Sequence, residues 1–223
     1  KLSHDSDLKY ISVGRLFMAI VTGAFTVYMI PGLWGAPLKL ISAFPPPLEY
    51  SESPYGVGYT LGGDAEVHKE EGQHLGPQGI MAFHDYEEGI AFAKSVNKPV
   101  MLDFTGKACV NCRKMEQGVW SDYQIKSILK NDVVLISLYV DDRKKLAEED
   151  QYETTLAGKK KKVRTIGDKW MVLQANTYKT NSQPYYVLLD SNGKPLLENA
   201  NYQDYGTIDL FKDWLNRGLA AFN

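Results

Sequence analysis

The longest apolar stretch of the chain lies near its start. Residues 16–38 carry no charged side chain, and apolar residues are densest before Pro31. Proline cannot continue a helix, so a helix confined to the start of this stretch would be too short for a bilayer. A helix that begins at Ile11 has the length of about 20 residues that a membrane span needs, with Arg15 extending its guanidinium toward the headgroups. The pattern therefore predicts a transmembrane helix.

Two other interpretations are a cleaved signal peptide and a buried helix of a soluble domain. Trp34 is bulky at a position where signal cleavage requires a small residue, which disfavours the first. Polar residues do not interrupt the stretch, which disfavours the second. Basic residues before the stretch outnumber the one that closely follows it, Lys1, Lys9 and Arg15 against Lys39. This asymmetry places the N-terminal end in the cytoplasm and the rest of the chain outside.

Residues 45–79 have a different composition. They contain five prolines, seven glycines, six acidic residues and one lysine, without a sustained apolar period. We expect an extended, mobile linker between a membrane segment at 1–44 and a domain at 80–223. His68 and His74, within this linker, are expected to be solvated rather than to bind metal.

Residues 80–223 show the alternating apolar segments of one globular domain. The expected elements are a helix over 85–97, a strand over 99–104, a helix from 109 interrupted near 118 and restarting at 121–122 toward 129, a strand over 132–140, a helix capped by 165–168, a hairpin of strands 185–189 and 195–197, and an amphipathic helix over 208–219. This order predicts an α/β fold, with a mostly parallel sheet, an antiparallel edge and helices on both faces.

Charge and cysteine content exclude several classes of function. Lys and Arg number 25 against 27 Asp and Glu, a net charge of -2 that gives no basic footprint for nucleic acid. The chain has two cysteines, Cys109 and Cys112, which excludes a disulfide-rich scaffold and a four-cysteine zinc module.

The two cysteines form a Cys-Val-Asn-Cys motif between a predicted strand and a predicted helix. Amides at a helix start stabilise a thiolate, so Cys109 is the candidate nucleophile. The i, i+3 spacing lets Cys112 attack a mixed disulfide on the same helical face. Disulfide exchange needs only this pair, and we expect no other cofactor.

Metal and haem interpretations of the motif are disfavoured. No cysteine or histidine follows residue 112, so a zinc site would have to recruit His68, His74 or His84 from upstream. Covalent haem attachment requires histidine at the position that Arg113 occupies.

Three further features lie near the motif. Asp103 interrupts an otherwise apolar strand, and a buried carboxyl there is a candidate general base for the Cys112 proton, with an edge or capping residue as the alternative. Pro184 precedes a strand, and a cis bond there would leave the backbone of Gln183 open to pair with an extended substrate. Gln183 and Pro184, with the spacer residues Val110 and Asn111, form the candidate substrate surface.

A basic run, Lys159 to Lys162, lies between the second predicted strand and the next helix. We expect it to be solvated, with an acidic partner or anionic lipid as the alternative. The flanks around Gly158 are expected to form a projecting hairpin.

Two segments carry a resemblance to a known family. The string 98–112, KPVMLDFTGKACVNC, together with QPYYVLLD at 183–190, looks like a thioredoxin-fold domain with a mixed central sheet. More closely, it resembles the C-terminal domain of the bacterial thiol:disulfide interchange protein DsbD family. Residues 30–39, IPGLWGAPLK, are similar to the end of the last membrane helix in that family, which extends the resemblance over nearly the whole chain.

The resemblance implies roles for individual residues. Cys109 would be the exposed nucleophile, Cys112 the resolving thiol, Asp103 the buried acid and Pro184 a cis proline. It also implies an anchored periplasmic reductase at the bacterial inner membrane. A membrane domain with its own cysteine pair would reduce it, and its partners would be disulfide isomerases and cytochrome c maturation proteins. This chain has no second pair, so it is expected to be a fragment or truncated relative.

Departures from the family pattern leave the direction of electron transfer open. Ala108 stands where thioredoxins usually have tryptophan, Val110 and Asn111 replace their Gly-Pro, and an insertion spans 146–164. Spacer residues tune the reduction potential, so its value is not inherited. The alternatives are an oxidase or isomerase of the same fold and a peptide-binding module without catalysis.

Overall fold

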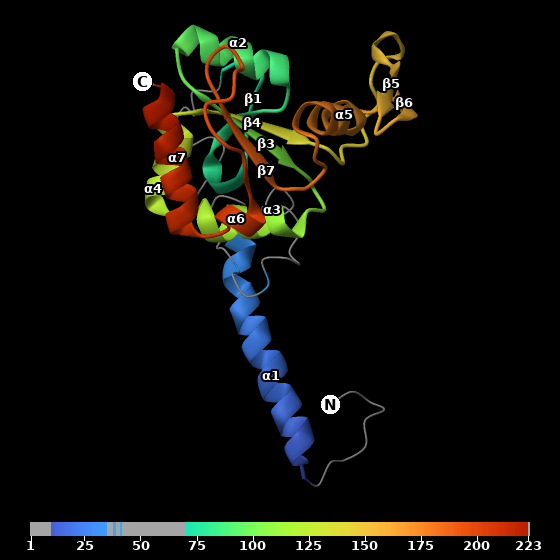
Figure 1. Ribbon diagram of the computed structural model, residues 1–223. Helices are drawn as coiled ribbons and strands as arrows, with labels where there is room; N and C mark the ends of the chain where they lie inside the picture. Colours follow the sequence, from blue (N-terminus) through green and yellow to red (C-terminus); the bar gives the residue numbers. More distant parts are fainter. Residues whose placement is uncertain (1–9, 35–37, 39–40, 42–69, 223) are drawn as a thin grey trace.

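The computed structural model describes residues 10–34, 38, 41 and 70–222, and Figure 1 shows their arrangement. A six-stranded sheet runs in the order β1-β2-β4-β3-β7-β8. Its strands are β1 (Gln73–Leu75), β2 (Met81–Phe83), β3 (Val100–Thr105), β4 (Val134–Tyr139), β7 (Tyr185–Leu189) and β8 (Ala200–Asn201). Strands β2, β4 and β3 are parallel, whereas β1, β7 and β8 each run antiparallel to their neighbours. The sheet is mixed, as the resemblance implied. Three of its five pairings are antiparallel, so the expectation of a mostly parallel sheet is wrong.

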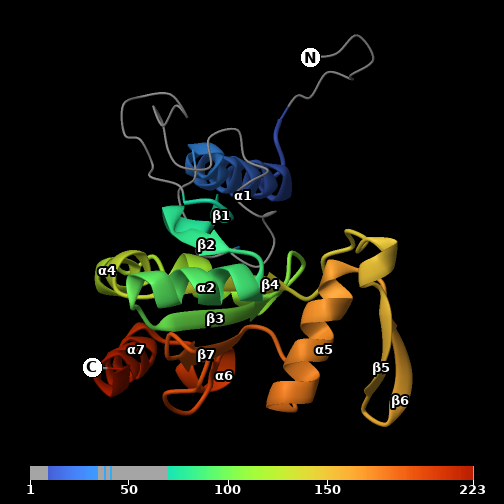
Figure 2. The same ribbon diagram turned by 90° about the horizontal axis from the view of Figure 1, so that it is seen from above.

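Helices cover both faces of this sheet. They are α2 (Tyr86–Val96), α3 (Val110–Lys114), α4 (Tyr123–Asn131), α5 (Ile166–Tyr178), α6 (Tyr202–Tyr205) and α7 (Ile208–Phe222), with a π-helical turn η5 (Met115–Val119) after α3. One core packs η5, α4 and α7 against the sheet, and the other packs α2 and α5 against the opposite face. Figures 1 and 2 both show α7 and α5 at opposite ends of the sheet. The fold is therefore the expected three-layer, thioredoxin-like arrangement.

Polar caps determine where the predicted helices start. Asp85 accepts hydrogen bonds from the backbone amides of the first turn of α2, and Asp122 does the same for α4. Thr165 begins α5 in a complete capping box with Asp168. The predicted interruption near Gly118 is also confirmed, because Gly118 lies in the π-helical turn between α3 and α4. These starts were readable because capping is a local interaction.

The predicted second hairpin strand at 195–197 is wrong. After the turn, residues 195–197 form an isolated bridge between Leu189 and Pro195 and no strand. On the side of β7 away from β3, the neighbouring strand is β8. Leu196 and Leu197 both pack against the same core cluster. Successive residues of a strand point to opposite faces, so this packing is incompatible with a regular strand.

The sheet begins earlier than the sequence indicated. Strand β1 lies within 45–79, the range predicted as linker, and pairs with β2. Each of these strands has three residues, too few to show an alternating pattern. A short 3₁₀ turn, η4 (Pro77–Gly79), separates them. The domain boundary at residue 80 stays a prediction, but ordered pairing reaches residue 73.

The N-terminal apolar stretch forms helix α1 (Val13–Met29), which continues as the 3₁₀ turn η1 (Ile30–Trp34). Ser12 caps it, so it starts two residues after the predicted Ile11. The segment Val13–Leu33 has 21 residues, and an 18-residue window within it has a mean hydropathy of 1.8 and no buried residue. Its length and composition fit a membrane-spanning helix, and a signal sequence would pass the same test.

The basic run forms the projecting hairpin that the sequence predicted. Strands β5 (Tyr152–Leu156) and β6 (Lys159–Val163) pair antiparallel outside the main sheet. They follow a short 3₁₀ turn, η6 (Glu148–Asp150), and pack against α5. Figures 1 and 2 show the hairpin extending beyond α5.

Candidate functional site

The two cysteines form a disulfide at the start of α3. Their sulfurs are 2.07 Å apart and their Cα atoms 5.3 Å apart. Cys109 is the N-cap of α3, and its Sγ accepts the backbone N–H of Cys112 at 3.2 Å. The sulfur of Cys109 thus faces the helix amides, as predicted from its position. Cys109 is partly exposed, whereas Cys112 is only 1% exposed.

Sequence analysis missed the carboxylate of Asp141, which holds residues 106–108. We call this segment, which leads from β3 to Cys109, the cysteine loop. Asp141 accepts the backbone N–H of Lys107 at 2.9 Å and that of Ala108 at 3.0 Å. Gly106 fits beside it, because a Cβ there would lie 3.1 Å from the Asp141 Oδ2 atom. A signal for Asp141 existed: it follows a predicted strand, and the ends of adjacent parallel strands meet at one sheet edge.

Asp103 lies in the middle of β3 and is 2% exposed, which confirms its predicted burial. The hydroxyl of Ser137, its register partner on β4, donates to Asp103 Oδ2 at 3.2 Å, and Oδ1 has no partner among the described residues. Burial raises the pKa of Asp103 to about 7, although the Ser137 hydrogen bond and the charge of Arg113 oppose the increase. This carboxyl can exchange a proton near neutral pH.

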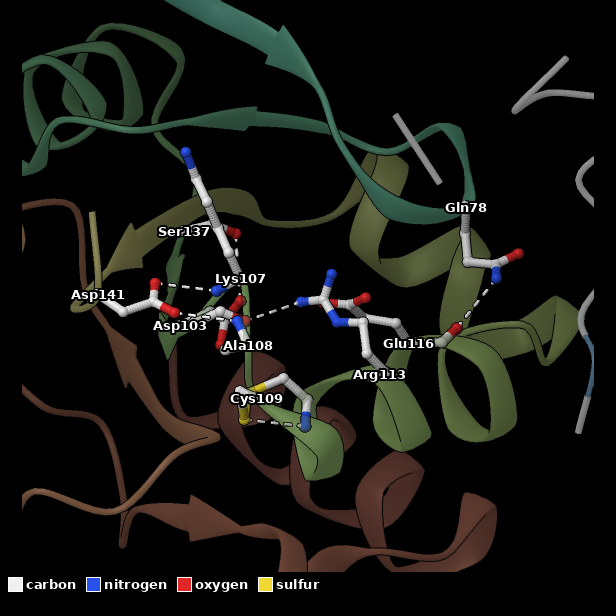
Figure 3. A network of polar contacts seen from close by, with 11 residues as sticks. Gln78, Asp103, Lys107, Ala108, Cys109, Arg113, Glu116, Ser137 and Asp141 are labelled. Carbon is white, nitrogen blue, oxygen red and sulfur yellow. Dashed lines mark hydrogen bonds and ion pairs between the residues drawn. A yellow bond between two sulfur atoms is a disulfide. The ribbon is translucent and has the colours of Figure 1, made fainter. Parts of the chain in front are cut away.

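A second buried acid close to the motif is paired. Arg113 Nη2 donates to Glu116 Oε1 at 2.6 Å, and both side chains are 7% exposed. The same nitrogen lies 3.4 Å from the backbone oxygen of Gly106, so the pair also braces the cysteine loop. Figure 3 shows this pair, the Asp141 contacts and the disulfide together. Sequence analysis missed the pair, although its i, i+3 spacing was a readable signal.

The Gln183–Pro184 peptide bond is cis, as the resemblance implied. Tyr185 pairs with Phe104 in the antiparallel register of β7 and β3, so Pro184 lies at the end of β3 that leads into the cysteine loop. Buried Gln174 of α5 anchors this segment by donating to the Ser182 backbone oxygen at 2.7 Å and accepting from the Gln183 side chain at 3.1 Å. The register brings Pro184 and the motif to one sheet edge.

The spacer residues of the motif occupy the first turn of α3. Val110 is 45% exposed, an apolar side chain in solvent, and Asn111 is partly exposed. Both positions are accessible from outside, and their role in substrate binding stays a prediction.

The structure describes two of the three histidines considered as metal ligands, His74 and His84. The rings of His74 and His84 stack with their centroids 4.8 Å apart, and His68 lies outside the described residues. Within residues 10–34, 38, 41 and 70–222, no group of three or more His, Cys, Asp or Glu side chains is placed to hold a metal ion.

Comparison with known proteins gives a family and several relatives. A model of the thioredoxin-like domain family matches residues 86–216. The thiol:disulfide interchange protein DsbD of Ralstonia nicotianae is 34% identical over 71 residues, which cover 30% of this chain and 12% of that protein. This chain therefore matches a small part of that relative, and the expected whole-chain resemblance to the DsbD family is not shown.

Solved structures with the same fold are more distant. The DsbH oxidoreductase is 21% identical, with a TM-score of 0.45 over 61% of this chain and 82% of that one. A thioredoxin from Thermus thermophilus is 20% identical, with a TM-score of 0.42 over 60% of this chain and 83% of that one.

The family match spans more than half of the chain, from the first turn of α2 into α7. It includes β3, the cysteine motif, β4 and β7, the elements that assemble the candidate site. The chain belongs to the thioredoxin-like domain family.

Proposed function

We propose that this chain is a membrane-anchored thiol:disulfide oxidoreductase that reduces disulfides of periplasmic proteins. The observation that carries the proposal is the Cys109–Cys112 pair at the start of α3, with Cys109 partly exposed and Cys112 buried. This asymmetry assigns attack on a partner to Cys109 and resolution to Cys112.

The exchange proceeds in two steps from the reduced chain. The Cys109 thiolate attacks one sulfur of the partner disulfide, forming a mixed disulfide and expelling the partner's first thiolate. The Cys112 thiolate then attacks Cys109 Sγ, which releases the partner's second thiolate and forms the Cys109–Cys112 bond. Two electrons pass to the partner, whose two thiolates are protonated from solvent, and the chain is oxidised.

Asp103 is the proposed acceptor of the Cys112 proton. Its pKa of about 7 suits a general base at neutral pH, since a much lower value would weaken it as a base. Because the carboxyl is buried and Oδ1 lacks a partner among the described residues, it can take a proton directly or through one water.

The substrate is expected to lie along the edge formed by the cysteine loop and the Gln183–Pro184 segment. Register pairing between β3 and β7 ends at Phe104 and Tyr185, so the backbone beyond it faces the position of an incoming strand. Val110 and Asn111 would contact the same segment from α3.

Membrane anchoring through α1 completes the proposal. Its apolar length supports a span, and the distribution of basic residues supports an N-terminal end in the cytoplasm with the domain in the periplasm of a bacterial inner membrane. The partial similarity to DsbD supports a membrane electron donor with its own cysteine pair, and disulfide isomerases or cytochrome c maturation proteins as acceptors.

The reduction potential of the Cys109–Cys112 pair tests the direction. The full chain in detergent is equilibrated with glutathione buffers, and the remaining thiols are alkylated and counted. We expect a potential near or below about -200 mV, in the range of reducing dithiols. A value near about -120 mV would identify an oxidant. Cys109→Ser is the control, because it cannot form the intramolecular disulfide.

A further inference from the structure

A cavity of about 310 Å³ lies beside the cysteine loop, on residues that the proposed exchange does not use. Its lining includes the stacked pair His74 and His84, two lysines, one carboxylate and a tryptophan, namely Lys107, Lys144, Asp142 and Trp170. The residues come from β1, from the segments that follow β2, β3 and β4, and from α5. Side chains distant in sequence thus converge at one edge of the sheet.

The cavity has the topological position in which α/β proteins bind ligands. The chain leaves β3 toward α3 and η5, which lies against one face of the sheet, and leaves β4 toward α5 on the other face. Since adjacent parallel strands send their connections to opposite faces, a crevice opens between the two loops. Lys107 begins one loop, and Asp142 and Lys144 lie in the other.

The charges lining the cavity favour an anion. The lining residues include two lysines, Lys107 and Lys144, and one acid, Asp142, whose carboxylate lies 3.7 Å from Lys107 Nζ. Trp170 contributes an apolar wall to the cavity, since its indole N–H is itself buried. A carboxylate entering the cavity would meet the two lysines.

The direction of the Lys107 side chain bears on what kind of ligand can reach both the cavity and the disulfide. Lys107 is two residues from Cys109, so their Cα atoms are at most about 7 Å apart. Figure 3 shows its side chain pointing away from the disulfide. The ammonium end of Lys107 therefore lies on the side of the loop away from the disulfide, and a protein surface is large enough to contact both.

We propose that this basic cavity binds an acidic side chain of the protein substrate, as a second contact beside the disulfide exchanged at Cys109. The inference rests on the proposed function, because it assigns the cavity to the same partner. It makes the cavity a determinant of partner choice, since a surface without a matching acid loses the contact.

The test uses pairs of disulfide-bonded peptides exchanged with the reduced full chain in detergent. Within a pair, the peptides are identical except for two Glu or two Gln residues, which are stepped from about three to seven residues from the disulfide to span roughly 10–23 Å. The rate constant of exchange is measured for each. At low ionic strength we expect the Glu peptide to react about three- to five-fold faster at one or more positions.

Variants assign that preference to the cavity. In Lys144→Gln, and separately in Lys107→Gln, the Glu-to-Gln rate ratio should fall toward one, as it should for the unchanged chain in 0.5 M KCl. Lys160→Gln is the matched control, because this exposed lysine lies on the β5–β6 hairpin away from the cavity, and it should keep the ratio. A ratio of one at every position, or a preference that survives both cavity variants, overturns the inference while exchange itself continues. Failure of both peptides to exchange overturns the proposed function as well.

Discussion

Asp103 in β3 and Glu116 at the start of η5 are two acids in similar burial, 2% and 6% exposed, whose charges are handled differently. Glu116 accepts a hydrogen bond from Arg113 at 2.6 Å, which compensates its charge within the domain. Asp103 has only a serine hydroxyl on one oxygen, and burial raises its pKa to about 7. Burial alone therefore does not decide whether the charge of a carboxylate is compensated. The partner decides it: Arg113 for Glu116, three residues away, and Ser137 for Asp103, across the sheet.

The contrast separates a bracing acid from a reactive one. The paired carboxylate of Glu116 holds Arg113, which also contacts the backbone oxygen of Gly106. An unpaired carboxyl with a pKa near neutrality can take and release a proton during exchange. The two acids lie on either side of the cysteine motif in the sequence, Asp103 on the strand before it and Glu116 in the π-helical turn after it.

Breaking the Arg113–Glu116 ion pair should have the largest effect on stability. Arg113→Met leaves Glu116 buried without its cation, so we expect the free energy of unfolding of the oxidised chain to fall by about 3–5 kcal/mol. Denaturant unfolding followed by tryptophan fluorescence measures it. The double variant Arg113→Met, Glu116→Leu should recover most of the loss, because no unpaired charge remains. A single variant within about 1 kcal/mol of the unchanged chain would show that the pair does not brace the domain.

Replacing the Asp103 carboxyl by a neutral amide should have an intermediate, pH-dependent effect on stability. The pKa of Asp103 is raised on folding, so the folded chain binds a proton that the unfolded chain has lost, and stability decreases as pH rises from about 4 through about 7. Asp103→Asn removes this loss. Between pH 5 and pH 8 the unchanged chain should lose about 2–3 kcal/mol more than the variant.

Unfolding curves of the oxidised chains at both pH values measure this difference. The same variant should slow release of the mixed disulfide, which alkylation of trapped intermediates records. Parallel pH profiles for Asp103→Asn and the unchanged chain would place the carboxyl in an ordinary ionised state and end its proposed role as base.

Removing the hydroxyl that contacts Asp103 should have the smallest effect. Ser137 lowers the pKa of Asp103, so Ser137→Ala raises it further and extends the loss of stability to higher pH. At pH 8 we expect the variant to be less stable by about 1 kcal/mol. In an Asp103→Asn background the substitution should no longer alter the pH profile. A pH-independent cost in both backgrounds would mean that the hydroxyl matters only for packing.

Much of the framework was predictable because its signals are local. The caps at Asp85, Asp122 and Thr165 and the apolar runs of β3 and β4 need only neighbouring residues to be recognised. The short strand β1 and the displaced strand β8 were missed, because two or three residues carry no periodic signal and gain their pairing from partners far along the chain.

The candidate site divides in the same way. The position of Cys109 after a strand and at a helix start predicted its contact with the helix amides, and the isolated Asp103 in an apolar run predicted a buried acid. The contacts of Asp141 with Lys107 and Ala108, and of Gln174 with the Gln183 segment, join residues up to 34 positions apart. No local pattern encodes them.

The sequence by itself determined the order of elements, the apolar N-terminal helix and the pair of thiols, since each depends on residues close together in the chain. Tertiary structure alone decided that Ser137 lies opposite Asp103, that Asp141 holds the cysteine loop, and that His74, Lys107 and Lys144 line one cavity. The physical reason is that strand register and sheet order bring these groups together, and both follow from how the whole core packs.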